Sequence, residues 1–142
     1  VNRELPTARW GFDAYLNGNG DVLSLVENYS FELPLVNASS TGSVSSVKLF
    51  KTFSTLVGRS GLRIVELVES DVAGWTVTFA NGISVVVGKT DVLNRLKRFI
   101  NLYEEVLRGN EDHVVMADAR YPSGVAIEWD GKISTLVASR GL

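Results

Sequence analysis

His113, the only histidine among the 142 residues, is the first candidate for a catalytic residue. A serine nucleophile would need this histidine as its base, and the sequence has no Gly-x-Ser-x-Gly elbow to present such a serine. The chain has no cysteine, which excludes a thiolate nucleophile and a cysteine-based zinc site. We therefore interpret His113 as a surface residue at the start of a strand.

The carboxylates near the end of the chain offer a second kind of chemistry. Asp112, Asp118 and Glu128 could be imagined as a pair that cleaves glycosidic bonds, but nothing in their spacing sets the separation that such chemistry requires. Residues 17–21 lack the distal glutamate of a calcium loop, and we interpret them as a turn. The sequence thus predicts no catalytic residue, no metal site and no cofactor, and a protein that is not an enzyme.

Composition narrows the class of protein further. With 45% hydrophobic and 21% charged residues, the chain has the make-up of one globular domain with a real core. A formal net charge of −2 argues against nucleic acid as the main partner, because binding phosphates needs a basic surface. No apolar run approaches the ~20 residues of a membrane-spanning helix. The chain begins with Val1, so we expect it to be a piece of something longer.

Residues 118–129 are predicted to form two strands joined by a tight turn at Pro122, whose ring fixes φ. A three-residue loop at 122–124 would pair Tyr121 with Val125 and Ala119 with Ile127. That register gathers the apolar side chains on one face, and Asp118, Arg120 and Glu128 on the other. A two-residue loop would break this pattern, so we predict a type I turn followed by a glycine bulge at Gly124.

The same reasoning applies to residues 75–87, the clearest hairpin of the sequence. A three-residue loop at 80–82 pairs Phe79 with Ile83, Val77 with Val85 and Trp75 with Val87, which makes one continuous apolar face. Nearer the amino terminus, residues 8–16 are predicted as one strand with an irregularity at Gly11. Residues 17–20 are a hairpin signal, and residues 21–26 return from it. Pro34 places residues 33–36 at a sheet edge or in extended coil.

Two amphipathic helices are predicted between these hairpins. The first begins near Ser43, whose hydroxyl can cap the exposed amides, and is ended by Gly58 and Gly61. The second follows Thr90 and Asp91 and carries an apolar stripe up to Leu107. Its basic residues, Arg95, Lys97 and Arg98, are placed on the solvated face. The fold class is therefore α+β, a mostly antiparallel sheet of hairpins with both helices on one face.

Several short motifs, in this order and spacing, resemble the bacterial cell-division protein family FtsQ (DivIB). They are Pro6-Thr-Ala-Arg-Trp10, residues 74–83, Gly88-Lys-Thr-Asp91, residues 96–103 and Asp118-Ala-Arg-Tyr-Pro-Ser-Gly124 with Trp129. The resemblance implies the β domain of the family's extracytoplasmic region, on the periplasmic side of the inner membrane. We expect residues 1–7 to be a remnant of a preceding domain or linker, 8–131 to be the β domain and 132–142 a C-terminal tail. Relatives carry a cytoplasmic tail, a membrane helix and a POTRA domain before this region, and we expect that anchor to lie outside this chain.

The candidate site is a surface rather than a catalytic centre. If the strand at 121–129 lies at the sheet edge, its unpaired backbone groups can accept a strand from another protein. From the residues alone, the hairpin could equally be the last piece of core, above all at Val125 and Ile127. The resemblance implies a scaffold of septum assembly whose end docks the bitopic division proteins FtsB and, with it, FtsL.

The resemblance also nominates the residues that make this contact: Arg120, Tyr121, Ser123, Gly124 and Trp129. Tyr121 and Trp129 would be apolar anchors, Ser123 and Gly124 would let another backbone approach, and Arg120 would pair with an acidic side chain of the partner. The alternative function is a small ligand-binding or sensory domain with a pocket beneath the helices, which a large apolar pocket with converging polar groups would support.

Overall fold

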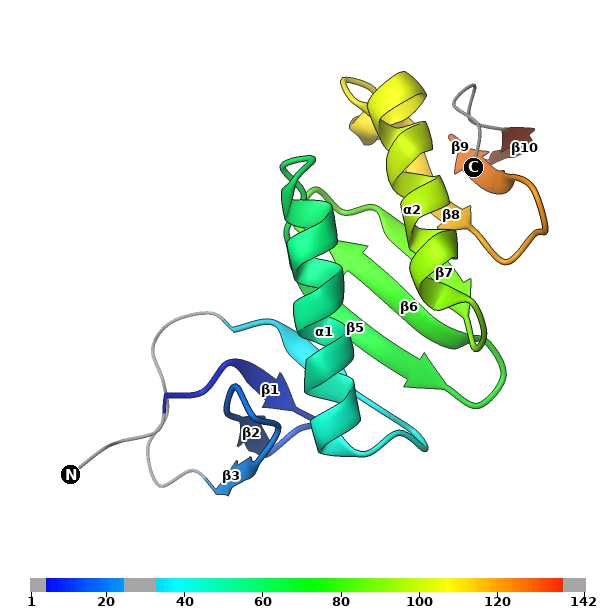
Figure 1. Ribbon diagram of the computed structural model, residues 1–142. Helices are drawn as coiled ribbons and strands as arrows, with labels where there is room; N and C mark the ends of the chain where they lie inside the picture. The colour runs from blue at the N-terminus through cyan, green and yellow to red at the C-terminus, as the bar shows by residue number, and fades with distance from the viewer. Residues whose placement is uncertain (1–4, 25–32, 137–142) are drawn as a thin grey trace.

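The computed structural model describes residues 5–24 and 33–136. Within these ranges the chain forms one sheet with the strand order β10-β9-β8-β7-β6-β5-β4-β1-β2-β3 (Figure 1). Six of the pairings are antiparallel and three are parallel. The strands are β1 (Ala8–Trp10), β2 (Ala14–Leu16), β3 (Val22–Ser24), β4 (Leu35–Asn37), β5 (Ile64–Ser70), β6 (Gly74–Phe79), β7 (Ser84–Gly88), β8 (Val114–Asp118), β9 (Val125–Trp129) and β10 (Lys132–Leu136).

Two helices cover the same face of this sheet (Figure 1). Helix α1 (Ser43–Gly58) packs on β4 and β5, and α2 (Val92–Leu102) packs on β7 and β9. A π-helical turn, η1 (Tyr103–Leu107), continues α2, and a short 3-10 helix, η2 (Glu111–His113), leads into β8. The predicted α+β class, with a mostly antiparallel sheet and both helices on one side, is confirmed. Among the described residues, no helix is long and apolar enough to cross a membrane.

The core is a row of side chains that runs across six paired strands beneath the helices. Each member pairs with the next in register, and each is fully buried: Val36, Leu67, Val77, Val85, Ala117 and Ile127. Phe99 of α2 stacks on Phe79 of β6 with ring centroids 5.8 Å apart. Because paired residues share a face, this row decides which side of every strand meets the helices.

The hairpin of β6 and β7 has the predicted register over most of its length. Val77 pairs with Val85, and the amide of Phe79 donates to the Ile83 carbonyl at 2.9 Å. At the open end the register shifts by one residue, so Trp75 pairs with Gly88 and the predicted pairing with Val87 is wrong. The bulge arises where the backbones of Gly74 and Gly88 lie too close together for a side chain on Gly74.

The hairpin of β8 and β9 differs from its prediction. The strands pair Asp118 with Ala126 and Ala117 with Ile127, so residues 119–124 form a longer connection than the predicted three-residue loop. The chain stays extended beyond Asp118 because the Ala119 amide donates to the Val86 carbonyl of β7 at 2.8 Å. A second bulge, between Val114 and Met116, turns Val115 out to solvent.

Two predictions near the amino terminus are corrected, and a third is confirmed. Residues 8–16 are two strands, β1 and β2, that turn back at Gly11 with φ of 63°. Strand β4 lies between β1 and β5 and pairs in parallel with both, so it is not an edge strand; Pro34 precedes the pairing and removes no ladder bond. The hairpin at 17–20 is confirmed, since β2 pairs with β3. The part of the predicted return strand after Ser24 lies outside the described residues.

The helix ends also differ in detail. Helix α1 starts at Ser43 as predicted, but the capping position is Gly42 and no side chain caps the amides. Helix α2 follows Asp91, whose backbone is left-handed and whose side chain accepts from Asn94 Nδ2 at 2.8 Å but does not cap the helix amides. Residues 132–136, expected to belong to a tail, form β10 at the end of the sheet.

Candidate partner-binding site

Four of the five nominated residues lie in the connection between β8 and β9. Arg120, Tyr121 and Ser123 are exposed, and 48% of the Tyr121 surface is accessible. Gly124 is buried directly before β9, and Trp129 is half-buried at the far end of that strand. At ~3.3 Å per residue, Gly124 and Trp129 are separated by about 16 Å. The five residues can contact one partner only if that partner runs along β9.

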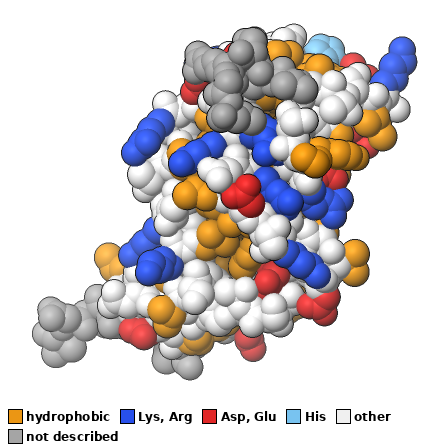
Figure 2. All heavy atoms as spheres, turned by 45° about the vertical axis from the view of Figure 1, so that its right-hand side comes forward, with side chains coloured by type: hydrophobic (Ala, Val, Ile, Leu, Met, Phe, Trp, Pro, Cys, Tyr) orange, Lys and Arg blue, Asp and Glu red, His pale blue; other side chains and the backbone are white. Residues whose placement is uncertain are grey.

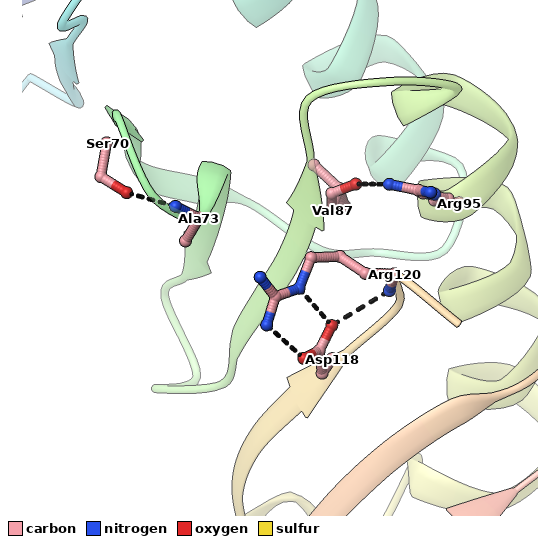
Figure 3. A network of polar contacts seen from close by, with 6 residues as sticks. All are labelled: Ser70, Ala73, Val87, Arg95, Asp118 and Arg120. Atoms are coloured by element: carbon pink, nitrogen blue, oxygen red, sulfur yellow. Dashed lines mark hydrogen bonds and ion pairs between the residues drawn. The ribbon is translucent and has the colours of Figure 1, made fainter. Parts of the chain in front are cut away.

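Arg120 is already paired within its own chain. Its Nε and Nη2 donate to Asp118 Oδ1 and Oδ2 at 2.9 and 2.7 Å, and the Arg120 amide also donates to Oδ1 at 3.0 Å (Figure 3). The Arg120 side chain holds the pKa of Asp118 below its ordinary value, against the opposing effect of partial burial. A partner carboxylate would therefore compete with Asp118 for this guanidinium. The bidentate pair shapes the start of the loop.

Arg98 of α2 contacts the backbone of the same loop. Only 8% of this residue is exposed, so its predicted place on the solvated face is wrong. Its Nη1 donates to the Tyr121 carbonyl at 2.5 Å and to the Ala119 carbonyl at 3.5 Å. Its Nε is buried and has no hydrogen-bond partner among the described residues. No spacing signal marks Arg98, because what turns it inward is the loop that packs against that flank of the helix.

Arg95, one turn earlier, also reaches the sheet. Its Nη1 donates to the Val87 carbonyl at 3.1 Å (Figure 3), so of the predicted basic cluster only Lys97 is fully exposed. Figure 2 brings this side of the molecule forward and shows Lys and Arg side chains across the middle of the face, with apolar and acidic groups between them. The charge on this face is thus mixed, and no broad basic surface forms there.

The edge of β9 is covered by the chain itself. Strand β10 pairs with β9 antiparallel over its whole length, from Lys132 opposite Trp129 to Leu136 opposite Val125. The turn between them, Asp130-Gly131, has positive φ at both residues, the signature of a two-residue type I′ hairpin. The condition for strand addition, that the strand at 121–129 lies at the sheet edge, is therefore not met, and β10 is the outermost strand at this end within the described residues.

The geometry does not support a catalytic role for His113 or a metal site. His113 is exposed and its Nδ1 lies 3.1 Å from Asp130 Oδ2, an ion pair only if the ring is protonated. Among the residues that the structure describes, no group of three or more acidic or histidine side chains could hold a metal ion.

The space beneath the helices is filled by aromatic side chains. Phe99, which stacks on Phe79, also meets Tyr103 with ring centroids 6.3 Å apart. A hollow of about 330 Å³ lies beside Tyr103, near Gly61 and Asn81, rather than under the helices. Tyr103 donates from its hydroxyl to Glu111 at this hollow, at 2.8 Å. This hollow has a mixed lining, so it is not the apolar pocket beneath the helices that the ligand-binding alternative requires.

Comparisons with known proteins address the family of the chain. Residues 8–120 match the family described as cell division protein FtsQ/DivIB, C-terminal. The cell division protein FtsQ of Neisseria meningitidis is 28% identical over 124 residues, covering 87% of this chain and 52% of that protein. FtsQ of Neisseria gonorrhoeae is 29% identical over 122 residues, covering 86% and 50%. FtsQ of Cellvibrio japonicus is 25% identical over 130 residues, covering 91% and 40%.

The matches are to part of each relative, since the chain spans about half the length of the curated relatives it matches. The family match ends at Arg120, so it includes β1 to β8 and both helices but stops before most of the nominated residues. The matched region nevertheless covers most of the chain, which therefore belongs to the FtsQ/DivIB family of cell division proteins.

Proposed function

We propose that this chain is the β domain of a non-enzymatic scaffold of bacterial septum assembly, located on the periplasmic side of the inner membrane. Its partners are FtsB and, with it, FtsL, which it binds at the carboxyl-terminal end of the sheet. Family membership supports the role in cell division. The observation that carries the site is the loop at 119–124, which is exposed at Tyr121 and Ser123 yet held along its first half by Arg98 and by the Arg120–Asp118 pair.

This arrangement suits docking rather than chemistry. Because the backbone at 119–121 is already held, this part of the loop loses little conformational entropy when a partner binds, and more of the contact energy appears as affinity. Tyr121 offers a large, rigid and accessible side chain of the type that dominates interfaces. Ser123 is small and exposed beside it, which lets a partner backbone come close.

The test is calorimetric titration with the membrane-proximal extracytoplasmic segment of the cognate FtsB. Ser123→Trp places a bulky side chain on the loop, and we expect binding to weaken by at least about tenfold. Ser45→Trp makes the same change at an exposed serine of α1, a helix that packs on β4 and β5, and should bind as the wild type does.

Two results would contradict the proposal at different points. Full binding by Ser123→Trp would remove the loop from the site while leaving the partner in place. Absence of binding by the wild-type chain, with folded protein confirmed by circular dichroism, would remove FtsB as a partner of this domain alone.

A further inference from the structure

Strand β10 is attached to the sheet almost entirely through its backbone. Residues 132–135 are all exposed, and Ile133 has 74% of its surface accessible. Leu136 alone packs partly against the core. By contrast, Val125 and Ile127 on the neighbouring strand β9 are fully buried. A strand that contributes so little apolar burial belongs to the least stable part of a sheet.

The pairing explains why β10 contributes so little. Its side chains on the helix side of the sheet are those opposite Trp129, Ile127 and Val125, and two of these three positions hold Lys132 and Ser134. An apolar residue at either position would extend the core row, whereas lysine and serine do not. The edge of β9 is thus occupied by a strand poorly matched to the surface it covers.

Strand β9 does not depend on β10 for its own place in the fold. Its other edge pairs with β8, and its buried residues belong to the same core cluster as Ala117 and Phe99. Release of β10 would therefore uncover one row of backbone amides and carbonyls along β9, with Gly124 at one end and Trp129 at the other.

We propose that β10 occupies the edge of β9 at which the partner binds, and that a strand of the partner displaces it. This inference rests on the proposed function and adds that docking requires β10 to leave the edge of β9. The incoming strand lies antiparallel to β9 in the register that β10 now has. It presents apolar side chains opposite Ile127 and Trp129, where this chain has Ser134 and Lys132.

A disulfide that locks β10 tests the displacement directly. A two-residue I′ turn makes Trp129 and Lys132 the hydrogen-bonded pair, so Glu128 and Ile133 form the adjacent non-hydrogen-bonded pair, whose side chains lie closest. The chain has no cysteine of its own, so Glu128→Cys with Ile133→Cys introduces a single redox-sensitive link. We expect the oxidised variant to bind the FtsB segment at least about tenfold more weakly than the reduced one.

A second disulfide, on the same face of the sheet but between β6 and β7, supplies the control. Thr78 and Ser84 pair across β6 and β7, and their hydroxyl oxygens are 2.9 Å apart. Thr78→Cys with Ser84→Cys therefore locks a hairpin whose strands are both central in the sheet, and its oxidation should leave FtsB binding unchanged. Equal binding by the oxidised and reduced Glu128/Ile133 variant would overturn the inference, because the partner would then add to the outer edge of β10 or bind elsewhere.

Hydrogen exchange in the free wild-type chain separates this inference from the proposed function. In the expected pattern, the amides of Ser134 and Leu136 bond to β9, while those of Ala126 and Glu128 bond to β8. We expect the β10 amides to exchange at least about a hundredfold faster, because β10 opens without the rest of the sheet. Equal rates would overturn the inference whatever FtsB does. Absence of FtsB binding by the wild type would overturn the proposed function, and the exchange rates would still decide whether β10 leaves the edge.

Discussion

At the scale of single residues, two charged side chains each hold a connecting segment through several hydrogen bonds with its backbone. Arg98 donates to carbonyls of the loop at 119–124. Glu69 of β5 accepts from the amides of Ser39, Ser40 and Thr41 at 3.1, 3.0 and 2.9 Å. In both cases a charged side chain satisfies backbone groups that no helix or sheet pairs. One substitution at either residue should therefore lower the stability of the protein measurably.

Replacing Arg98 by Met should lower the free energy of unfolding by about 1–3 kcal/mol, because the Tyr121 carbonyl loses its donor. Methionine keeps the apolar stem of the side chain, so the loss reports on the guanidinium. Lys97→Met, at the exposed neighbouring position, should change the free energy by no more than about 0.5 kcal/mol. Urea unfolding of the two variants makes the comparison, and equal stability would show that Arg98 does not support the loop.

Glu69 should make stability depend on pH in the acid range. Burial acts to raise its pKa, but the hydrogen bonds from Ser40, Thr41 and Ser39 outweigh this and lower the pKa from 4.5 to about 2. Because the folded-state pKa lies below the unfolded one, the contribution is complete above about pH 4.5 and is lost as the pH falls towards 2. After allowance for solvent screening at this partly exposed site, we expect about 1 kcal/mol.

The measurement compares wild type with Glu69→Gln by urea unfolding at several pH values. At pH 7 the variant should be less stable by about 1 kcal/mol, and the two proteins should converge near pH 2. A gap that stays constant over this range would mean that the lost contribution is not the ionised carboxylate.

At the scale of elements, the hairpin of β6 and β7 depends on two glycines at its open end. A Cβ on Gly74, which has φ of +74°, would lie 2.3 Å from the Gly88 carbonyl carbon and 2.7 Å from the Lys89 amide nitrogen. These are backbone atoms of the adjacent strand and cannot move aside without opening the pairing. The bulge that shifts Trp75 opposite Gly88 is thus made by close backbone approach.

Gly74→Ala should therefore cost about 3 kcal/mol or more, the sum of left-handed backbone strain and overpacking. Gly82→Ala is the matched control, since Gly82 also has positive φ, +95°, but nothing lies within 4 Å of its Cβ position. It should cost only the backbone term, about 1–2 kcal/mol. Thermal unfolding of both variants decides the matter, and equal losses would mean that the two strands separate at little cost.

At the scale of the whole molecule, one core cluster joins the two ends of the sheet. It includes Ala8 of β1 and Ile127 of β9, and Trp10 and Trp129 pack against it from opposite ends. No boundary divides the row of buried side chains beneath the helices. The described sheet should therefore unfold as one cooperative unit, apart from β10.

Single-tryptophan variants test this cooperativity. The chain has three tryptophans, so Trp75→Phe with Trp129→Phe leaves Trp10 as the reporter, and Trp10→Phe with Trp75→Phe leaves Trp129. In each variant the urea midpoint of fluorescence should equal that of far-ultraviolet circular dichroism. Different midpoints in either variant would show that the two ends of the sheet unfold separately.

The fold class and the register at the closed end of the β6–β7 hairpin could be predicted from the sequence, and short motifs pointed to the family. The fold class and this register depend on local alternation and spacing, which place Val77 opposite Val85 and Leu96 on the buried face of α2 whatever lies further away. Only the three-dimensional structure shows that Arg98 turns inward and that β4 lies in the middle of the sheet, whereas β10 follows β9 across Asp130-Gly131, a local turn signal that the prediction missed. The places of Arg98 and β4 depend on hydrogen bonds to backbone groups distant in the chain, and such bonds leave no period in the sequence because any residue can offer a carbonyl or an amide.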